Sequence, residues 1–415
     1  MFMLLGLCGV VCISSCHRPG EELAVLRPLD RVDGPLVRVR IGKHRTSVRL
    51  HATGGLSIRP VLPGEPVRRF ATSIAIECQP RGFTIRPSGR PPLLWPKREL
   101  RVESSNGEHL LVNGQAYPGR IRVVAVTSGA PYYFDVINDL PMEQYLPGVL
   151  DRELFSHWHP AMYRAQAIAA RSYAARQLEQ NRRRHFDIEA TTASQVYGGI
   201  TANLRSHESV RATYGMMLTY RGHILTAYYS SCCGGTGQDA ALAFPKGADV
   251  PPLHGKARGH WCGKSPYFRW GPITRRKDDL VRRLAAWGQG RNHPIAEIRG
   301  LSRVWITSRN QAGRPGRFTI RDDRKRTFEL GSEEFRFACN FEGADLPELT
   351  TKTRLRSSDV KVTAYSRSIK FTHGRGYGHG VGMCQYGGQA MAQKGHDEST
   401  ILAFYYPSAK IDRIY

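Results

Sequence analysis

The stretch FTHGRGYGHGVGMCQYGGQAMAQK, residues 371–394, decides how the rest of the chain is interpreted. Glycine occupies every second position from Gly374 to Gly382, so in an extended strand these glycines all face one side. So many glycines weaken a strand and usually mark the close approach of another backbone or a ligand. A helix is predicted over 385–394, ended by Gly395. We therefore expect a strand-to-helix unit whose bare face lies against something else.

A nucleotide-binding loop does not fit this spacing. His379, Val381 or Met383 stands where G-x-G-x-x-G needs its third glycine, and no GK[ST] follows. Two interpretations of the glycine pattern stay open at this point. The unit is either a tightly packed junction without a ligand or part of a binding groove.

The composition is that of a globular protein with two to three domains. Of the 415 residues, 41% are hydrophobic and 23% are charged, which argues against wholesale disorder. Lys plus Arg number 60 against 35 Asp plus Glu, a net charge of +25. Such a surface suits an anionic partner, whether nucleic acid, anionic lipid or acidic wall polymer, and charge alone does not choose among them. A solvated basic surface without a dedicated partner is the other interpretation.

Residues 1–16, MFMLLGLCGVVCISSC, form an apolar run that is too short for a confident membrane span. The run is typical of an export signal, although no Lys or Arg precedes it. Ile13-Ser14-Ser15-Cys16 resembles a lipoprotein lipobox, which makes Cys16 a lipidation candidate. A disposable signal or an uncleaved anchor is the alternative. We expect an exported protein of the bacterial cell envelope or periplasm.

Six of the nine cysteines lie after residue 16, and none forms a C-x-x-C pair, so a zinc ribbon or a thioredoxin-like motif is not supported. Either Cys232 or Cys233 could pair with Cys262 in a disulfide, closing a loop of roughly 30 residues. A metal cluster that includes His254 and His260 is the rival interpretation. We predict no metal and no cofactor.

The hydrophobic pattern predicts an α+β fold, with mixed β-sheets and packed helices after a β-rich N-terminal region. Apolar and polar residues alternate in the strand-like pieces of 36–59, and Asn113-Gly114 is a strong hairpin signal. Residues 79–97 are rich in proline and glycine and predict a long connection. The second half mixes a helix over 278–287 with strands near 302–307 and 317–320, without regular βαβ alternation.

One glutamate lies on the apolar face of a predicted helix. Asn138-Asp139 and Pro141 are typical of a helix start, and Glu153 continues the face that Met142 begins. Burial of a carboxylate raises its pKa, which lets it act as a general acid near neutral pH. The alternative is a helix-terminal glutamate whose side chain reaches solvent. The face is made by Met142, Tyr145, Leu146, Val149 and Leu150.

Two further charged residues belong to this region. Glu143 lies in the first turn of the helix, where a negative charge complements the helix dipole, so we interpret it as structural. Pro160 begins a second, alanine-rich helix with Arg171 in its middle. Arg171 could orient an acidic group or a substrate, although most helix arginines are solvated.

Six segments resemble, in order, the stage II sporulation protein D family, whose relatives include lytic transglycosylases of denuded peptidoglycan and amidase enhancers. The resemblance runs from about Tyr117 to Tyr415, roughly 70% of the chain. It implies a catalytic domain at 107–415, which would follow the signal or lipoprotein signal segment at 1–16 and the β-rich region with its Pro/Arg-rich connection at 17–106. The segments are LPMEQYLPGVLDREL, YRAQAIAARSYA, TTASQVYGG, AYYSSCCGGTG, GHGVGMCQYGGQAMAQKG and FYYPSAKI.

The resemblance implies a lytic transglycosylase that cleaves the bond between N-acetylmuramic acid and N-acetylglucosamine in glycan strands without stem peptides, leaving 1,6-anhydro ends. Glu153 would be the single acid and base, because attack by the substrate's own 6-hydroxyl needs no activated water. The glycine-rich stretch would line or support the substrate groove. The substrate-binding positions are Arg171, Ser230, Thr236, Tyr377, His379 and Gln385.

The chain departs from the family pattern at several positions. Tyr229 stands where relatives commonly have histidine, which would alter a polar contact, and Pro252 stands where many have tyrosine. Relative to the family, the two changes could mean an altered substrate or weak activity. Residues 191–194 replace a His and Cys zinc cluster of some relatives, so that zinc is not expected. The segment WCGKSPYFRW around Cys262 is similar to a Cys-x-x-Ser-Pro feature of some relatives and favours a disulfide.

The alternative function is a non-catalytic, wall-binding activator of an N-acetylmuramoyl-L-alanine amidase. Nucleic-acid binding is a third interpretation that rests on charge alone, and we expect no nucleic acid. The expected partners are peptidoglycan glycan strands and a cell-wall amidase, with a membrane contact only through an N-terminal anchor. A role in sporulation and a role in division or wall remodelling both stay open.

Overall fold

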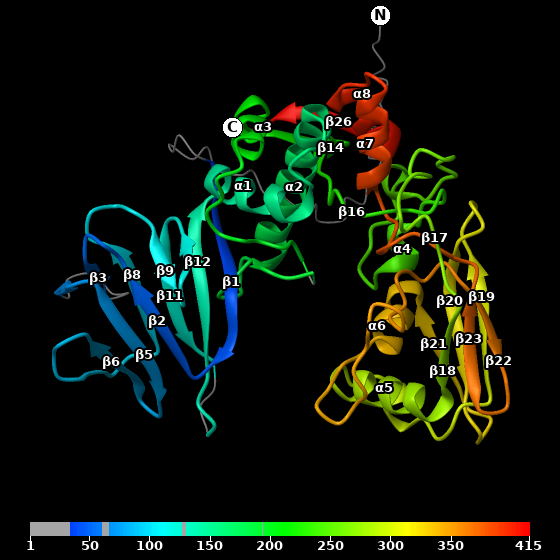
Figure 1. Cartoon of the computed structure of the whole chain (residues 1–415), viewed down its shortest axis with the longest axis horizontal. Coiled ribbons are helices and arrows are strands. Elements are labelled where there is room, and N and C mark those ends of the chain that lie inside the picture. The colour runs from blue at the N-terminus through cyan, green and yellow to red at the C-terminus, as the bar shows by residue number, and fades with distance from the viewer. Residues whose placement is uncertain (1–33, 60–65, 127–129, 193) are drawn as a thin grey trace, which may run out of the picture.

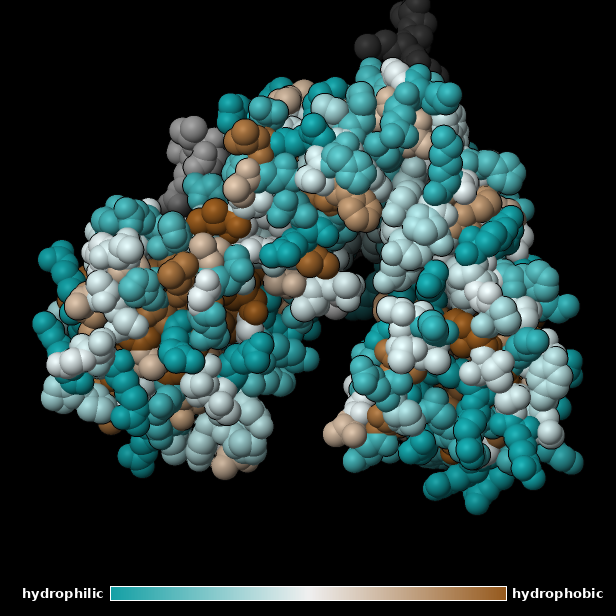
Figure 2. All heavy atoms as spheres, viewed as in Figure 1, coloured by the Kyte–Doolittle hydropathy of each residue, from teal (hydrophilic) through white to brown (hydrophobic). Residues whose placement is uncertain are grey.

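The computed structural model describes residues 34–59, 66–126, 130–192 and 194–415. The chain forms an arch, with a β-rich N-terminal lobe and a second β-containing lobe hanging from a central helical layer (Figure 1). Figure 2 shows the open space between the two outer lobes. The predicted α+β fold with a β-rich N-terminal region is confirmed. Cys16 and its lipobox lie outside the described residues, and within those residues no helix is both long and apolar enough to cross a membrane.

The N-terminal lobe is made of two sheets that pack their apolar faces together. One sheet has the order β13-β1-β12-β11-β8-β3-β4, and the other the order β10-β9-β2-β5-β6-β7. The core between them includes Leu50, Ile76, Phe83, Val102 and Phe134. The strands are β1 (Leu36–Arg45), β2 (Ser47–His51), β3 (Leu56–Arg59), β4 (Arg68–Phe70), β5 (Ser73–Gln79), β6 (Gly82–Pro87), β7 (Leu93–Trp95), β8 (Glu99–Ser104), β9 (Leu110–Val112), β10 (Gln115–Tyr117), β11 (Arg120–Ala125), β12 (Phe134–Pro141) and β13 (Ile188–Glu189).

The predicted strands between residues 36 and 59 are confirmed, and so is the hairpin at Asn113-Gly114, where both residues have positive φ. The prediction of a long connection at 79–97 is wrong, because this segment contains β6 and β7. Proline is tolerated there since Pro87 ends β6 and β7 is an edge strand. The predicted boundary at residue 106 falls inside the lobe, where β9–β12 share sheets with earlier strands.

The central layer holds most of the helices around one core. Alanine-rich α2 lies in its middle, and its small side chains let α1, α7 and α8 pack closely (Figure 1). The helices are α1 (Met142–Glu153), α2 (Pro160–Asn181), α3 (Leu204–Ala212), α7 (Gln385–Gln393) and α8 (Glu398–Tyr405). Short strands complete the layer: β14 (Met216–Tyr220), β15 (His223–Ile224) and β26 (Lys410–Arg413) in one sheet, and β16 (Tyr229–Ser230) beside β25 (Met383–Cys384).

The sequence predicts the main helices of this layer correctly. Helix α1 follows Pro141 directly and buries the predicted apolar face. Helix α2 begins at Pro160, and the His159 side chain caps it by accepting a hydrogen bond from the Ala161 N–H. Helix α7 ends just before Gly395, which has φ +89°.

The second lobe is an insertion between residues 268 and 376. Its entry strand β17 (Arg269–Trp270) pairs with its exit strand β24 (Gly374–Arg375), so the two form a neck. The predicted helix and strands of 278–320 are confirmed. The lobe contains β18 (Ile273–Arg276), α5 (Lys277–Gln289), β19 (Arg303–Arg309), β20 (Pro315–Arg321), β21 (Thr327–Gly331), α6 (Ser332–Cys339), β22 (Lys361–Ala364) and β23 (Ser368–Thr372), with α4 (Ala240–Ala243) beside it.

The glycine-rich stretch is not the extended strand that its alternation predicts. Gly376, Gly378, Gly380 and Gly382 all have positive φ, so the backbone is irregular between β24 and β25. The expected close approach is nevertheless present. A Cβ on Gly376 would lie 2.4 Å from the Cys232 carbonyl oxygen, and a Cβ on Gly382 would lie 2.0 Å from that of Tyr228. Glycine is required because the segment around β16 lies directly against this backbone.

Candidate active site

Glu153 is the last residue of α1, and it meets the first residue of α7. Gln385 Nε2 donates a hydrogen bond of 3.0 Å to Glu153 Oε2. Gln385 is buried and follows β25, which pairs in parallel with β16. The carboxylate is therefore held at the meeting point of α1, β16 and α7, with its side chain only partly exposed.

Burial raises the pKa of Glu153 above its ordinary value, and this effect outweighs the hydrogen bonds from Gln385 and from the Val196 backbone, which lower it. None of these groups is a second carboxylate. A carboxyl group in this environment holds its proton more readily than an exposed one, which suits a general acid. This direction agrees with the one expected from the sequence, and the role of Glu153 as the acid stays a prediction.

A buried glutamine, Gln195, links two tyrosines near Glu153 by hydrogen bonds. Gln195 accepts a hydrogen bond of 3.1 Å from the Tyr145 hydroxyl, and its Nε2 donates to the Tyr229 hydroxyl at 3.0 Å. Burial, and next the nearby Glu153 charge, raise the pKa of Tyr229, so its hydroxyl keeps its proton. Gln195 belongs to the motif TTASQVYGG, but its role was not predicted.

Five aromatic side chains run from α1 to the glycine-rich stretch, and we call them the aromatic row. Phe155 is 52% exposed and packs against Trp158, and Trp158 packs against Tyr386 with ring centroids 5.1 Å apart. Tyr386 contacts Tyr267 at 6.2 Å, and Tyr267 contacts Tyr377 at 4.8 Å. The row begins two residues after Glu153 in the sequence and includes Tyr386, which directly follows Gln385.

An aromatic row near an acid suits a ligand with both apolar and polar surfaces. The ring faces can contact the apolar surface, while the tyrosine hydroxyls and the tryptophan N–H form hydrogen bonds with polar groups or water. Tyr377, a predicted substrate-binding residue, is 39% exposed at one end of the row. Sequence reasoning missed the other four members. The available signal was their position, since all four lie in or beside the motifs that carry the family resemblance.

Five of the seven predicted catalytic and substrate-binding residues divide into two groups. Glu153, Gln385 and Tyr377 lie at the site described above. Ser230 and Thr236 are buried under the glycine-rich stretch, where Ser230 Oγ accepts a hydrogen bond from the Gly380 N–H. Their contact with a substrate stays a prediction.

The structure corrects the prediction that Arg171 binds substrate. Its side chain is 0% exposed and makes two hydrogen bonds of 2.8 Å with Glu143. Its remaining donors point to Thr213 and to backbone carbonyls. Arg171 therefore holds α2 to α1 and to β14, and Glu143 is structural as predicted.

His379 lies partly exposed in the glycine-rich stretch, where its Nδ1 accepts a hydrogen bond from the Val381 N–H at 2.9 Å. Burial lowers the pKa of His379 to about 4, so the ring is neutral. Contact of His379 with a substrate stays a prediction.

The cysteines of the predicted disulfide come together as free thiols. Cys233 Sγ lies 3.7 Å from Cys262 Sγ, and Cys232 is in the same buried group. The rival cluster with histidine is not formed among the described residues. His254 bonds the exposed Asp249 carboxylate instead, and no metal-ligating group there includes a histidine.

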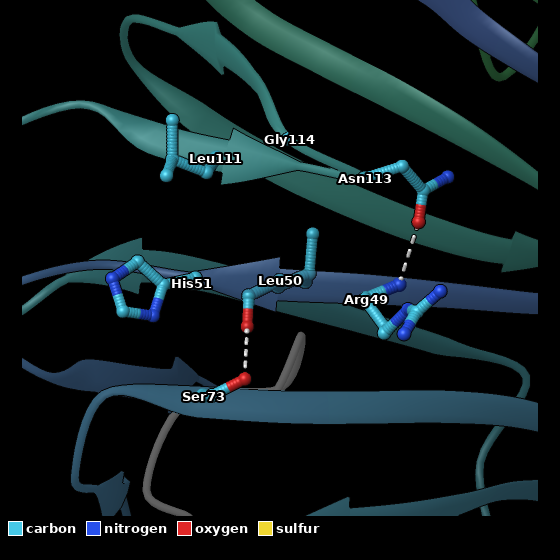
Figure 3. A pocket seen from close by; sticks show the side chains of 7 residues that line it. All are labelled: Arg49, Leu50, His51, Ser73, Leu111, Asn113 and Gly114. Carbon is cyan, nitrogen blue, oxygen red and sulfur yellow. Dashed lines mark hydrogen bonds between the residues drawn. The ribbon is translucent and has the colours of Figure 1, made fainter.

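Two hollows lie away from Glu153. A shallow one of about 350 Å³ on the N-terminal lobe is shown in Figure 3, where Asn113 Oδ1 accepts a hydrogen bond from the Arg49 N–H. Its lining includes no carboxylate, so it offers no acid. A second hollow of about 480 Å³ in the inserted lobe is basic and suits an anion. It is lined by Arg269, Arg309, Asp359, Val360, Lys361, His373 and Arg375.

Comparison with known proteins shows similarity to stage II sporulation protein D and to an amidase enhancer. Residues 132–220, which contain Glu153, match the family model SpoIID, described as stage II sporulation protein. An uncharacterized protein of Brachyspira hyodysenteriae is 29% identical over 321 residues, covering 76% of this chain and 77% of that protein. The amidase enhancer of Bacillus subtilis is 27% identical over 64% of this chain but only 40% of its own length. The stage II sporulation protein D of Bacillus amyloliquefaciens is 24% identical, over 66% of this chain and 75% of that protein.

Proposed function

We propose, from the premise that this chain carries a domain of the stage II sporulation protein D and amidase enhancer family, that it is an exported lytic transglycosylase of peptidoglycan. The family supports a role connected with the cell wall. The observation that carries the proposed activity is the partly exposed Glu153, with its raised pKa and its hydrogen bond from Gln385.

The proposed reaction needs one carboxyl group. Glu153 donates its proton to the glycosidic oxygen as the bond from that oxygen to the anomeric carbon of N-acetylmuramic acid breaks. The carboxylate then accepts the proton of the 6-hydroxyl, whose oxygen forms the new bond to the same carbon. Glu153 ends protonated, and the product is a 1,6-anhydro end. Intramolecular attack supplies a high effective concentration of the nucleophile.

The proposed substrate is a glycan strand from which an amidase has removed the stem peptides. The aromatic row beside Glu153 would contact the apolar faces of successive sugars. The test is mass spectrometry of denuded and peptide-bearing strands after incubation with the chain and with Glu153→Gln. Anhydro ends from the unaltered chain alone support the proposal, and an active Glu153→Gln protein contradicts it.

A second function is favoured by the match to the amidase enhancer of Bacillus subtilis. In that case the chain binds wall polymer and accelerates an amidase without cutting glycan itself. Its signature is faster release of stem peptides when amidase and chain are mixed, with no anhydro ends from the chain alone. Glu153→Gln would then leave the acceleration unchanged.

A further inference from the structure

Three buried cysteines from separate parts of the sequence come together next to the candidate active site. The sulfur atoms of Cys232, Cys262 and Cys384 all lie within 4.8 Å of one another. Cys232 follows β16, Cys262 lies in the loop before β17, and Cys384 ends β25 directly before Gln385. The three cysteines therefore bring together the segment after β16, the loop before β17 and the start of α7.

A fourth cysteine lies beside the trio. Cys233 Sγ is 3.7 Å from Cys262 Sγ. A tetrahedral site with metal–sulfur bonds of about 2.3 Å has sulfur atoms about 3.8 Å apart, whereas a disulfide needs about 2.05 Å. The spacing of this one pair matches neighbouring ligands of one metal ion, whereas Cys233 does not belong to the group of sulfur atoms that all lie within 4.8 Å of one another.

The surroundings of the cluster need negative charge. Arg258 is buried, and two of its nitrogens donate to the backbone carbonyls of Phe404 and Tyr405. Its Nε has no hydrogen-bond partner among the described residues, and the groups that act most on its charge are tyrosines and cysteines, not carboxylates. A buried guanidinium without a counter-charge is costly. The thiols of Cys233 and Cys384 are close enough to act on Arg258 electrostatically, and as thiolates on a bound metal ion they would supply the missing charge.

The backbone also offers a donor to sulfur. The Cys233 N–H donates a hydrogen bond of 3.2 Å to Cys384 Sγ. Donors of this kind stabilise thiolates and are typical of metal–thiolate sites. This donor is present because the chain turns at Gly234 and Gly235, both with positive φ.

We propose that Cys232, Cys262 and Cys384 bind one thiophilic metal ion, best matched by Zn²⁺, and that Cys233 completes the site as the fourth ligand. Each thiol releases its proton on binding, and no electron is transferred. The site is closed by four protein ligands, so its role is structural. It would fix Cys384 and, through it, the position of Gln385. The sequence predicted no metal because these ligands come from three segments without a C-x-x-C pair.

The test measures the metal directly and does not depend on glycan cleavage. The chain is purified with Zn²⁺ present, and its metal content is measured by inductively coupled plasma mass spectrometry. We expect one zinc per chain, a loss of at least ten-fold for Cys384→Ser, and no loss for Cys339→Ser. Cys339 is a matched control because it is equally buried but lies in the inserted lobe.

A measurement on the unaltered chain covers the case in which Cys384→Ser does not fold. Replacing zinc by Co²⁺ should give the intense sulfur-to-cobalt absorption and the visible bands of tetrahedral cobalt–thiolate sites. Absence of metal, with peptide mapping that shows disulfides among these four cysteines, would overturn the proposal. Equal zinc in Cys384→Ser and the unaltered chain would overturn it as well.

Discussion

Gln385 Nε2 and Glu153 Oε2 form a hydrogen bond of 3.0 Å although 232 positions separate the two residues in sequence. This hydrogen bond lowers the pKa of Glu153, whereas burial raises the same pKa and is the larger effect. The amide therefore restrains the shift that burial causes, and it orients the carboxyl group without supplying charge. The position of Gln385, and with it the orientation of the Glu153 carboxyl group, therefore depends on where α7 begins.

Replacing Gln385 by leucine should lower kcat of the proposed glycan cleavage by about ten-fold or more, because the Glu153 carboxylate loses the hydrogen bond from the amide. The pKa of Glu153 should rise, since an interaction that favours its carboxylate is removed. The alkaline limb of the pH–rate profile of glycan cleavage should accordingly move to higher pH. Gln389→Ala is the control, because Gln389 lies one turn later in α7 and bonds the His159 N–H instead. An unmoved limb in Gln385→Leu would contradict this role.

Glu153→Gln should make the fold more stable at pH 8 than at pH 4, relative to the unaltered chain. When folding raises the pKa of a carboxyl group, the folded protein loses stability as pH rises from the unfolded pKa of about 4.3 through the folded value. The neutral amide avoids this loss. We expect the melting temperature to gain a few degrees more at pH 8 than at pH 4, as measured by calorimetry. Glu208→Gln, on the exposed surface of α3, should show no such difference.

Arg171→Met should cost about 3–5 kcal/mol of unfolding free energy, because it leaves the Glu143 carboxylate without its buried partner. Arg176→Met is the matched control on the same helix. Its pair with Glu179 is partly exposed and should contribute under about 1 kcal/mol. Urea unfolding of both variants checks the difference. Weaker glycan binding by fully folded Arg171→Met protein would instead restore the predicted role in substrate binding.

Tyr377→Ala should weaken binding of denuded glycan by roughly three- to ten-fold, the range expected for one aromatic contact. Tyr377→Phe should bind like the unaltered chain, because the ring face and not the hydroxyl makes the proposed contact. Tyr365 is also exposed but lies after β22 in the inserted lobe, so Tyr365→Ala should have no effect. Isothermal titration with glycan fragments measures all three. Equal binding by Tyr377→Ala and the unaltered chain would remove Tyr377 from the site.

The sequence predicts local elements better than it predicts which of them meet. The periodicity around α1 places Glu153 correctly, because a helical face is a local property. Arg171 was misjudged because its partner, Glu143, is set by tertiary packing that motif positions do not reveal. The aromatic row was missed for the same reason, since its members come from three separate segments.

The glycine-rich stretch shows the same limit within one segment. Alternating glycine is consistent with an extended strand, and nothing local signals the positive φ values that Gly376 to Gly382 adopt. What the glycine pattern does indicate is that side chains would not fit at these positions. The space is occupied by the neighbouring segment around β16, which is more than 140 residues earlier in the chain.

Two glycines with similar backbone conformations separate the need for space from the need for positive φ. Gly382 has φ +66° and Gly395 has φ +89°, but a Cβ on Gly395 would meet nothing within 4 Å. Gly395→Ala should therefore cost only about 1–2 kcal/mol, the strain of the left-handed conformation. Gly382→Ala carries the same strain and places its Cβ 2.0 Å from the Tyr228 carbonyl oxygen.

Backbone cannot yield as a flexible side chain can, so Gly382→Ala should cost several kcal/mol more than Gly395→Ala and disturb the pairing of β16 with β25. Gln385 follows β25 directly, so the loss of activity should exceed that of Gly395→Ala even in the folded fraction. Urea unfolding and glycan cleavage, measured on both variants, check the two effects. Equal stability of the two variants would mean that the glycine-rich stretch is free to move away from β16, and the close packing beneath the site would then not be required for it.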